Sequence, residues 1–139
     1  MFANTYQPKD DPRFTQVEAS CSFSLKFPTG YIATCTTSYD VHKSAFLRME
    51  GTDAWAELSP AFGYHGNKLT WSRLEESKEV QLIPQIEEKD QFGLEMDHFC
   101  ECILQDKMPR TPGEEGLRDH RIMEAIYASA ASGLAVKLS

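Results

Sequence analysis

Apolar and polar residues alternate almost without a break from Val17 to Phe27. One set consists of Val17, Ala19, Cys21, Phe23, Leu25 and Phe27, and the other of Glu18, Ser20, Ser22, Ser24 and Lys26. A period of two predicts a β-strand with one buried face. The following Pro28-Thr29-Gly30 predicts a three-residue hairpin loop, because proline presets φ and glycine accepts a left-handed conformation.

The hairpin also predicts a register. If Phe27 pairs with Tyr31, the apolar residues of both strands share one face, as a hairpin over a core requires. The expected pairs are Phe23 with Cys35, Leu25 with Ala33 and Ala19 with Tyr39.

The opposite face of this hairpin is rich in hydroxyl groups and has no charge at its centre. Solvent exposure is the simplest explanation, but strands that face only water usually carry more charge. A flat, uncharged sheet of this kind suits a wet interface between subunits. We therefore expect a homo-oligomer that pairs through Ser20, Ser22, Ser24, Ile32, Thr34, Thr36 and Ser38.

Three further strands are predicted at residues 45–50, 54–58 and 68–73, and a sixth at 80–83, because each is a short apolar segment bounded by turn residues. Residues 74–79 are charged and are expected to be exposed. The first eleven residues show no clear period and are interpreted as irregular.

Two helices follow. Phe92, Met96, Phe99 and Ile103 recur at intervals of four, three and four, which predicts an amphipathic helix with these residues and Cys100 buried and Asp90 as the N-cap. The second helix is expected to have Thr111 as its cap, Pro112 as its first residue and Glu114 closing a capping box, and to end at Gly133. Its apolar line consists of Leu117, Ile122, Ala125, Ile126 and Ser129.

The predicted fold is a single α+β domain over residues 1–139. It has an open, mainly antiparallel sheet of about five or six strands, with the two helices packed on one face. A chain of 139 residues is long enough for one ordinary core but too short for a dinucleotide-binding unit and a substrate domain together.

Composition narrows the classes of partner. The chain has 21 acidic and 14 basic residues and a formal charge of −7, which disfavours nucleic acid and anionic membranes. No apolar run approaches the roughly 18 residues that span a bilayer. The start of the chain does not resemble a signal peptide, so we expect a cytoplasmic protein with four reduced cysteines.

The cysteines do not predict a metal site. Cys100 and Cys102 lie close to His98 in sequence, but residues two apart on a helix point about 200° apart and do not face a common ion. Cys100 is expected to face inward and Cys102 sideways or outward. Cys21 and Cys35 are expected to be diagonal neighbours on the sheet and to remain unbonded thiols in an apolar setting.

Three features in a fixed order carry a family resemblance. They are the strand pair joined by Phe27-Pro28-Thr29-Gly30, the stretch Pro-Ala-Phe-Gly-Tyr-His-Gly at 60–66, and Met108-Pro109-Arg110-Thr111-Pro112-Gly113-Glu114 before the last helix. From about Phe14 to Leu138, the chain resembles the C-terminal domain of the family of glucose-fructose oxidoreductase, inositol dehydrogenase and the MocA proteins.

The resemblance implies a complete enzyme with an N-terminal Rossmann domain, NAD or NADP as cofactor, and an open sheet that pairs subunits. This sequence lacks the family's phosphate-binding G-x-G-x-x-G turn, its Glu-Lys-Pro segment and its Asp-x-x-x-His pair. Consequently no catalytic, cofactor-binding or metal-binding residue is assigned to it. The resemblance implies the substrate-side and oligomerisation domain of an NAD(P)-dependent oxidoreductase acting on a sugar, polyol or related hydroxyl compound.

Three residues are candidates for contacts with the substrate or with the missing domain. Tyr64 and His65 lie in a glycine-flanked stretch that can present side chains, although a turn that packs on the sheet is the simpler explanation. Arg121 is on the last helix, where a solvated face is the simpler explanation.

Two other functions stay open. The chain can be a stand-alone interaction protein that is derived from such an enzyme and acts through its sheet. A small independent enzyme has less support, because no pair of nucleophile and base stands out.

The missing phosphate-binding turn gives a first testable prediction. Isothermal titration of the isolated chain with NADH and with NADPH should detect no binding tighter than about millimolar, because no motif is present to hold a pyrophosphate. A micromolar dissociation constant for either nucleotide would contradict this interpretation.

Overall fold

The computed structural model describes residues 1–138, and its contacts divide the chain into two compact units. The first unit contains Met1–Val41 and the segment from Arg110 onward, and the second contains His42–Pro109. Both units have antiparallel strands and a helix, so the predicted α+β class is confirmed. The strands differ from the prediction in one respect, because the described residues form two hydrogen-bonded sheets, of three and four strands, instead of one sheet.

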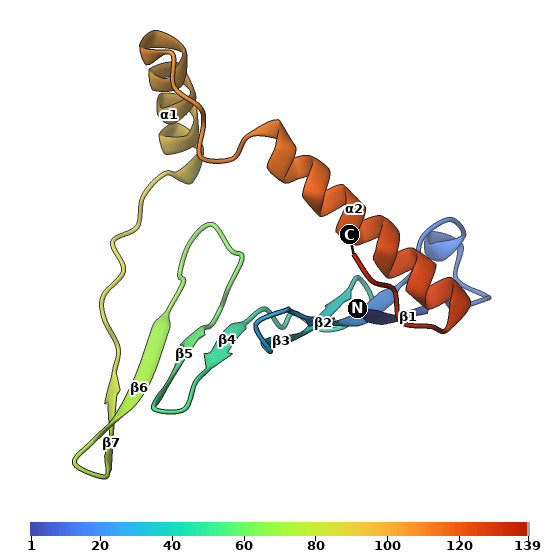
Figure 1. The fold of residues 1–139 in the computed structure, drawn as a ribbon, viewed down its shortest axis with the longest axis horizontal. Coiled ribbons are helices and arrows are strands. Elements are labelled where there is room, and N and C mark those ends of the chain that lie inside the picture. Colours follow the sequence, from blue (N-terminus) through green and yellow to red (C-terminus); the bar gives the residue numbers. More distant parts are fainter. Residues whose placement is uncertain (139) are drawn as a thin grey trace. The chain divides into compact units, whose positions relative to one another are not determined.

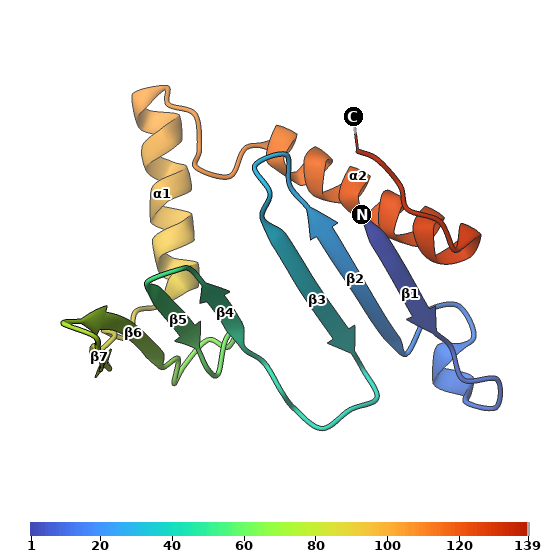
Figure 2. The same ribbon diagram turned by 60° about the horizontal axis from the view of Figure 1, so that its bottom comes forward.

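The first unit has a sheet in the order β1-β2-β3, formed by Phe2–Tyr6, Ser20–Lys26 and Ile32–Ser38 (Figure 2). The predicted hairpin register is confirmed: Phe23 lies opposite Cys35, and Leu25 opposite Ala33. The backbone N–H of Phe27 donates to the carbonyl of Tyr31 at 2.8 Å, and that of Tyr39 to the carbonyl of Ala19 at 2.9 Å.

Strand β1 was not predicted, and the interpretation of the first residues as irregular is wrong. Between Phe2 and Tyr6 only Ala3 is buried, so the segment carries almost no hydrophobic period. Its extended conformation depends on antiparallel pairing with β2, where Ala3 lies opposite Phe23 and Thr5 opposite Cys21. A one-turn 3₁₀ helix, Pro12–Phe14, then leads toward β2.

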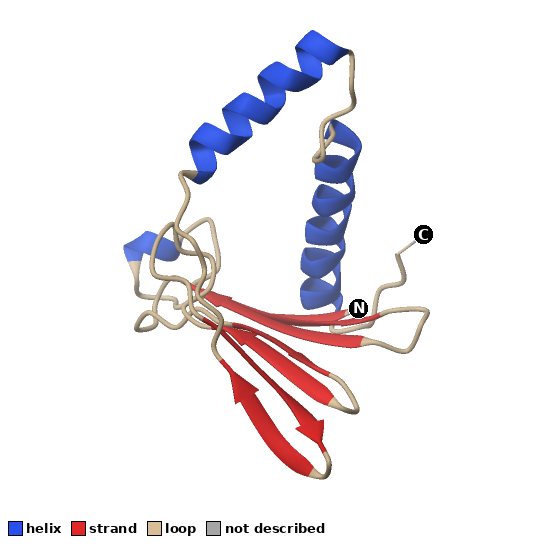
Figure 3. Cartoon of the chain, turned by 90° about the vertical axis from the view of Figure 1, so that its left-hand side faces the viewer, coloured by secondary structure: helices blue, strands red, loops and turns tan. Residues whose placement is uncertain are grey.

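The core of the first unit lies between this sheet and α2, Gly113–Ser132, whose C-terminal half packs against the sheet (Figures 1 and 3). Ala3, Cys21 and Ile126 form its buried centre. Burial raises the pKa of the Cys21 thiol above its usual range, and the nearby Glu18 carboxylate adds to the effect. The surrounding partly buried apolar residues are Met1, Phe23, Ile122 and Ala130.

Ser129 connects α2 to both ends of the chain. It is fully buried, and its Oγ accepts a hydrogen bond from the backbone N–H of Ala3 at 3.1 Å and donates to the carbonyl of Leu134 at 2.7 Å. The backbone N–H of Val136 in turn donates to the carbonyl of Met1 at 2.9 Å. The end of the chain therefore folds back beside β1.

The boundaries of α2 were predicted in part. Its end at Gly133 is confirmed, where a left-handed φ of 67° lets the backbone N–H return to the carbonyl of Ser129. Its start is one residue later than predicted, because Pro112 occupies the N-cap position and no side chain caps the helix. The capping box of Thr111 and Glu114 is therefore absent.

The second unit has a sheet in the order β4-β5-β6-β7, formed by Leu47–Glu50, Ala54–Leu58, Leu69–Glu75 and Lys78–Leu82. These strands confirm the four predicted segments with small changes at their ends. The charged segment 74–79 is exposed as predicted, and it contains the ends of β6 and β7 and the turn between them, where Glu76 and Ser77 have left-handed φ values.

Helix α1, Gln91–Gln105, begins as predicted, since Asp90 accepts hydrogen bonds from the N–H groups of Phe92 and Gly93 at 3.1 and 3.2 Å. The predicted burial of its apolar stripe is wrong, because Phe99 is 58% and Ile103 66% exposed. The two thiols are also reversed: Cys102 is buried and Cys100 is exposed. Within its own unit the stripe is contacted at Phe92, by the Tyr64 ring, and Phe99 is not a core residue.

A hydrogen-bonded network lies on one face of the second sheet. The Glu79 carboxylate accepts from Ser72 Oγ at 2.6 Å and from Trp55 Nε1 at 3.2 Å. The hydrogen bond from Ser72, followed by that from Trp55, lowers the pKa of Glu79 below its ordinary value. Arg48 lies over the Trp55 ring at 4.3 Å and forms ion pairs with two carboxylates of the same face, those of Glu50 and Glu57.

The position of Ser129 predicts a specific loss of stability. Ser129→Ala leaves the Ala3 N–H and the Leu134 carbonyl without their buried partner and should lower the free energy of unfolding by about 1–3 kcal/mol. Urea unfolding followed by circular dichroism measures it. Glu124→Ala changes an exposed residue of the same helix and should change stability by less than about 0.5 kcal/mol. Equal losses in the two variants would contradict the assigned role of Ser129.

The Glu79 network predicts that the stability of the second unit depends on pH. A carboxyl whose pKa is lowered on folding stabilises the protein above its unfolded pKa, and this contribution disappears as the pH falls from about 4.5 through the folded pKa. The wild type should be more stable than Glu79→Gln at neutral pH, and the difference should shrink in that acid window.

Both tryptophans, Trp55 and Trp71, lie in the second unit, so urea unfolding followed by tryptophan fluorescence reports on it. Glu95→Gln, on the exposed surface of α1, controls for the loss of one charge. A difference between wild type and Glu79→Gln that grows toward acid pH would show that the carboxylate does not stabilise the network.

Candidate functional site

The predicted subunit-pairing surface forms one row on each strand of the hairpin. We call it the hydroxyl face, defined by Ser20, Ser22, Ser24, Ile32, Thr34, Thr36 and Ser38. The register places Ser20 opposite Ser38, Ser22 opposite Thr36 and Ser24 opposite Thr34, and Ser20 Oγ lies 2.6 Å from Ser38 Oγ. Because Cys21 and Phe23 point to the α2 side, this face is turned away from the helix.

Strand β1 extends the hydroxyl face, an extension that was not predicted from the sequence. Phe2 lies opposite Ser24, Asn4 opposite Ser22 and Tyr6 opposite Ser20. Phe2 and Tyr6 are exposed, so the face has two aromatic rings along one edge and Ile32 at the other. The alternation of Phe2, Asn4 and Tyr6 with Ala3 and Thr5 was the available signal, but five residues are too few to establish a period.

Tyr64 and His65 lie in the loop between β5 and β6, and a second segment of the same unit holds this loop. The Glu88 carboxylate accepts a hydrogen bond from the N–H of Gly66 at 2.9 Å and lies 3.9 Å from His65 Nδ1. The Tyr64 ring meets the Phe92 ring edge-on, with 5.1 Å between ring centroids. The structure therefore adds Glu88 and Phe92 to the two residues that the sequence indicated.

The loop is also closed internally. Its base is formed by a hydrogen bond from the Ser59 N–H to the carbonyl of Lys68 at 2.9 Å, and Asn67 Nδ2 donates to the carbonyl of Gly63 at 3.1 Å. Gly66 has a φ of 74°, a conformation that favours glycine. Gly66 therefore serves the turn itself, and the side chains of Tyr64 and His65 stay exposed on the loop.

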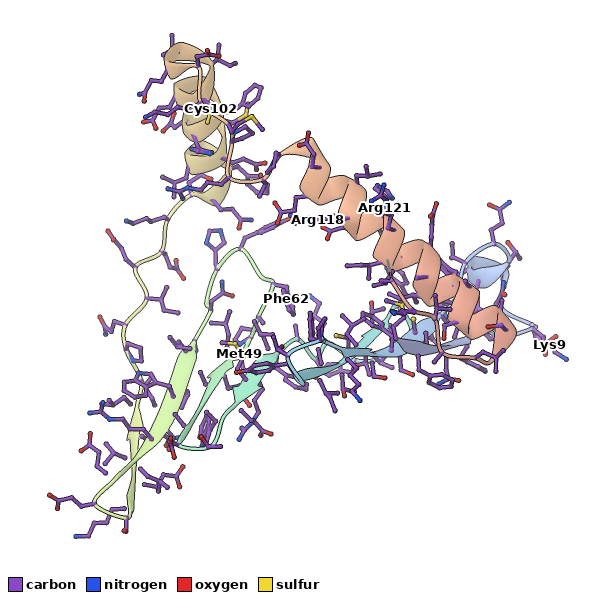
Figure 4. All side chains as sticks on the ribbon, in the orientation of Figure 1. Lys9, Met49, Phe62, Cys102, Arg118 and Arg121 are labelled. Atoms are coloured by element: carbon purple, nitrogen blue, oxygen red, sulfur yellow. The ribbon has the colours of Figure 1, made fainter. Side chains whose placement is uncertain are left out.

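Arg121 belongs to the first unit, whereas Tyr64 and His65 belong to the second. It is exposed on α2, about one turn after Arg118, and Figure 4 labels both arginines on that helix. The three candidate residues thus do not form one site within a single unit.

A shallow depression of about 360 Å³ lies on the second sheet beside the Glu79 network. Glu50, Asp53 and Glu79 contribute carboxylates to its lining, together with Trp55 and Arg73. This surface was not predicted from the sequence, because its members come from four different strands and the turn between β4 and β5.

Among residues 1–138 no group of three or more His, Cys, Asp or Glu side chains has the arrangement of a metal site. His98 Nε2 lies 3.6 Å from the Sγ of Cys102, one turn along the same helix. No helix within these same residues has both the length and the apolar character that crossing a membrane requires.

The described residues do not fit a dinucleotide cofactor. A pyrophosphate binds at a helix N-terminus with free N–H groups and a positive partial charge. The Asp90 carboxylate already accepts the N–H groups at the start of α1, and Glu114 and Glu115 place negative charge in the first turn of α2. Neither helix start therefore favours a phosphate group.

Comparison with known proteins gives a consistent set of relatives. The D-xylose 1-dehydrogenase [NADP(+)] of Haloarcula marismortui is 29% identical over 117 residues, which cover 84% of this chain and 32% of the relative. The D-xylose 1-dehydrogenase (NADP(+)) 2 of Haloferax volcanii is 26% identical over 134 residues, which cover 96% of this chain and 41% of the relative.

Solved structures show the same fold. The aldose-aldose oxidoreductase from Caulobacter crescentus, in a complex with glycerol, superposes with a TM-score of 0.87 and 36% identity over 99% of this chain and 40% of its own. The putative oxidoreductase YvaA from Bacillus subtilis superposes with a TM-score of 0.79 over 99% of this chain and 45% of its own, and its 13% identity supports the fold alone.

The chain thus spans less than half the length of each of these proteins. Residues 2–138 match the family model for the C-terminal alpha/beta domain of an oxidoreductase family. This is the family of glucose-fructose oxidoreductase, inositol dehydrogenase and MocA. With the order of its strands and helices, this match shows that the chain belongs to that family as its C-terminal domain.

Proposed function

We propose that this chain is the substrate-side and subunit-pairing domain of an NADP-dependent oxidoreductase that acts on an aldose. The family match over residues 2–138 carries the proposal, because it extends over nearly the whole chain. The preference for NADP and for a sugar comes from the relatives, of which two are NADP⁺-dependent xylose dehydrogenases and one is an aldose-aldose oxidoreductase.

In the proposed enzyme, one domain would bind the nucleotide and the other the sugar. Oxidation of an aldose removes a hydride and a proton from the sugar, and the described residues do not fit the nucleotide that would accept the hydride. A Rossmann domain outside these 139 residues would bind the nucleotide. This chain would contribute hydrogen-bonding groups for a neutral sugar, with Tyr64 and His65 from the β5–β6 loop as candidates, and Arg121 on α2 would contact the nucleotide-binding domain.

A longer protein tests this function directly. If the DNA upstream encodes a Rossmann domain in phase, the protein made from the longer frame should reduce NADP⁺ in the presence of D-xylose or D-glucose. Absorbance of NADPH measures the rate. A longer protein that binds NADP⁺ but oxidises no aldose would contradict the proposed substrate class.

We also propose that the hydroxyl face pairs two copies of the chain. Its central rows carry hydroxyl groups and no charge, so the cost of removing water is low and nothing repels an identical surface. A two-fold axis, the commonest symmetry of soluble homo-oligomers, would bring the same rows together. The exposed rings of Phe2 and Tyr6 would add apolar contact at the edge.

The enzyme is proposed to work in the cytoplasm. Cys21, Cys35, Cys100 and Cys102 are all unbonded in the structure, which agrees with a reducing compartment.

The pairing proposal predicts a change of oligomeric state. Ser22→Glu together with Thr36→Glu places two carboxylates at the centre of each hydroxyl face, where two copies would repel each other. Analytical ultracentrifugation should show a dimer or tetramer for the wild type and a monomer for the double variant, with an unchanged circular dichroism spectrum.

A matched control adds the same charge outside the hydroxyl face. Thr15→Glu together with Gln16→Glu changes two exposed residues of the same unit and should leave the oligomer intact. A wild type that is monomeric at about 100 µM, or a face variant that assembles as well as the control, would show that the hydroxyl face does not pair subunits.

A further inference from the structure

We propose that Phe62 is a specificity-determining contact for the sugar, with its ring held outward by the β5–β6 loop to pack on the C–H groups of the aldose. This inference rests on the proposed function and adds a residue that the sequence did not indicate. Figure 4 labels Phe62 on this loop, which lies at the end of the second sheet opposite the β4–β5 and β6–β7 turns.

The loop has a firmly held base on which Phe62 is placed. Ala61, the residue before it, is buried, and its N–H donates to the carbonyl of Ala45 at 2.8 Å. The residues after it are closed by Asn67 and held by Glu88. Since the backbone is bonded on both sides of Phe62, the fold sets the direction in which its side chain leaves the backbone.

Folding of the second unit does not explain the conformation of Phe62. Its φ is 62°, in the left-handed region, which is unfavourable for a bulky residue relative to its usual conformations. Its side chain is 77% exposed, so little apolar burial offsets that cost. Strained positions with exposed side chains are typical of binding sites, because the strain serves a contact outside the unit.

The groups around Phe62 fit a neutral sugar. One face of an aldose ring presents C–H groups, which suit the negative face of an aromatic ring, and its rim presents hydroxyl groups. Tyr64 and His65 follow within three residues on the same loop and provide hydrogen-bonding groups for that rim. The Glu88 carboxylate, bonded to the loop, disfavours an anionic ligand such as a sugar phosphate.

Saturation-transfer NMR on the 139-residue chain tests the contact. Irradiation of aromatic protons should transfer magnetisation to the C–H protons of D-xylose, and Phe62→Asn should weaken the binding of D-xylose by about tenfold, as expected for loss of one apolar contact. Asparagine tolerates the left-handed conformation, so the thermal midpoint of this variant should not fall. D-xylose 5-phosphate should give less transfer than D-xylose.

Phe27→Asn is the matched control, because it removes another exposed phenyl ring, in the hairpin of the first unit, and should leave D-xylose binding unchanged. Equal binding by Phe62→Asn and the wild type would overturn the proposal, and so would a wild-type chain that shows no transfer to D-xylose. Stronger transfer to the sugar phosphate would overturn the choice of a neutral sugar.

The longer protein separates this inference from the proposed function. There Phe62→Asn should raise the KM for D-xylose by about tenfold with little change in kcat, because the ring binds sugar and takes no part in the chemistry. If the longer protein oxidises the sugar and Phe62→Asn leaves its KM unchanged, the role of Phe62 is contradicted and the proposed function is not. NADP⁺ binding without sugar oxidation by the wild type would contradict the proposed function.

Discussion

The buried hydroxyl of Ser129 is the interaction on which the first unit depends. It binds the N–H of Ala3 and the carbonyl of Leu134, and so holds β1 and the last residues of the chain against α2. The apolar core beside it is small, with Ala3, Cys21 and Ile126 at its centre, so a polar contact at this position sets the register of the helix on the sheet. The alternation along β2 puts Cys21 and Phe23 on the face that α2 covers and leaves the hydroxyl face open.

The second unit is organised by side chains that hold backbone in place. Glu79 joins β5, β6 and β7 through Trp55 and Ser72, and Glu88 fastens the β5–β6 loop to the segment before α1. Both carboxylates act on groups distant in sequence. The loop that carries Tyr64 and His65 is closed at its base by the hydrogen bond from Ser59 to Lys68 and is held by the Glu88 carboxylate.

Local patterns were sufficient to predict the hairpin, the four strands of the second sheet, the Asp90 cap and the Gly133 stop, because period, turn residues and cap residues act within a few positions. They failed where the structure depends on distant partners. Strand β1 forms through its pairing with β2 and the hydroxyl of Ser129, neither visible in five residues. Pro112 replaced Thr111 as the cap because the hydroxyl of Thr111 makes no capping bond. Glu88 and Phe62 were missed because a distant hydrogen bond and an unusual φ leave no pattern in sequence.

The apolar stripe of α1 has the period of a core helix, yet its own unit leaves Phe99 and Ile103 exposed. We therefore expect unequal stability along the chain, with the packing around Ser129 as its most stable part. Amide hydrogen exchange of the isolated chain measures this residue by residue. Amides of α2 near Ala125–Ser129 and of β2 should exchange slowest, and those of α1 should exchange nearly as fast as in an unpacked helix. Equal protection of α1 and α2 would contradict the account.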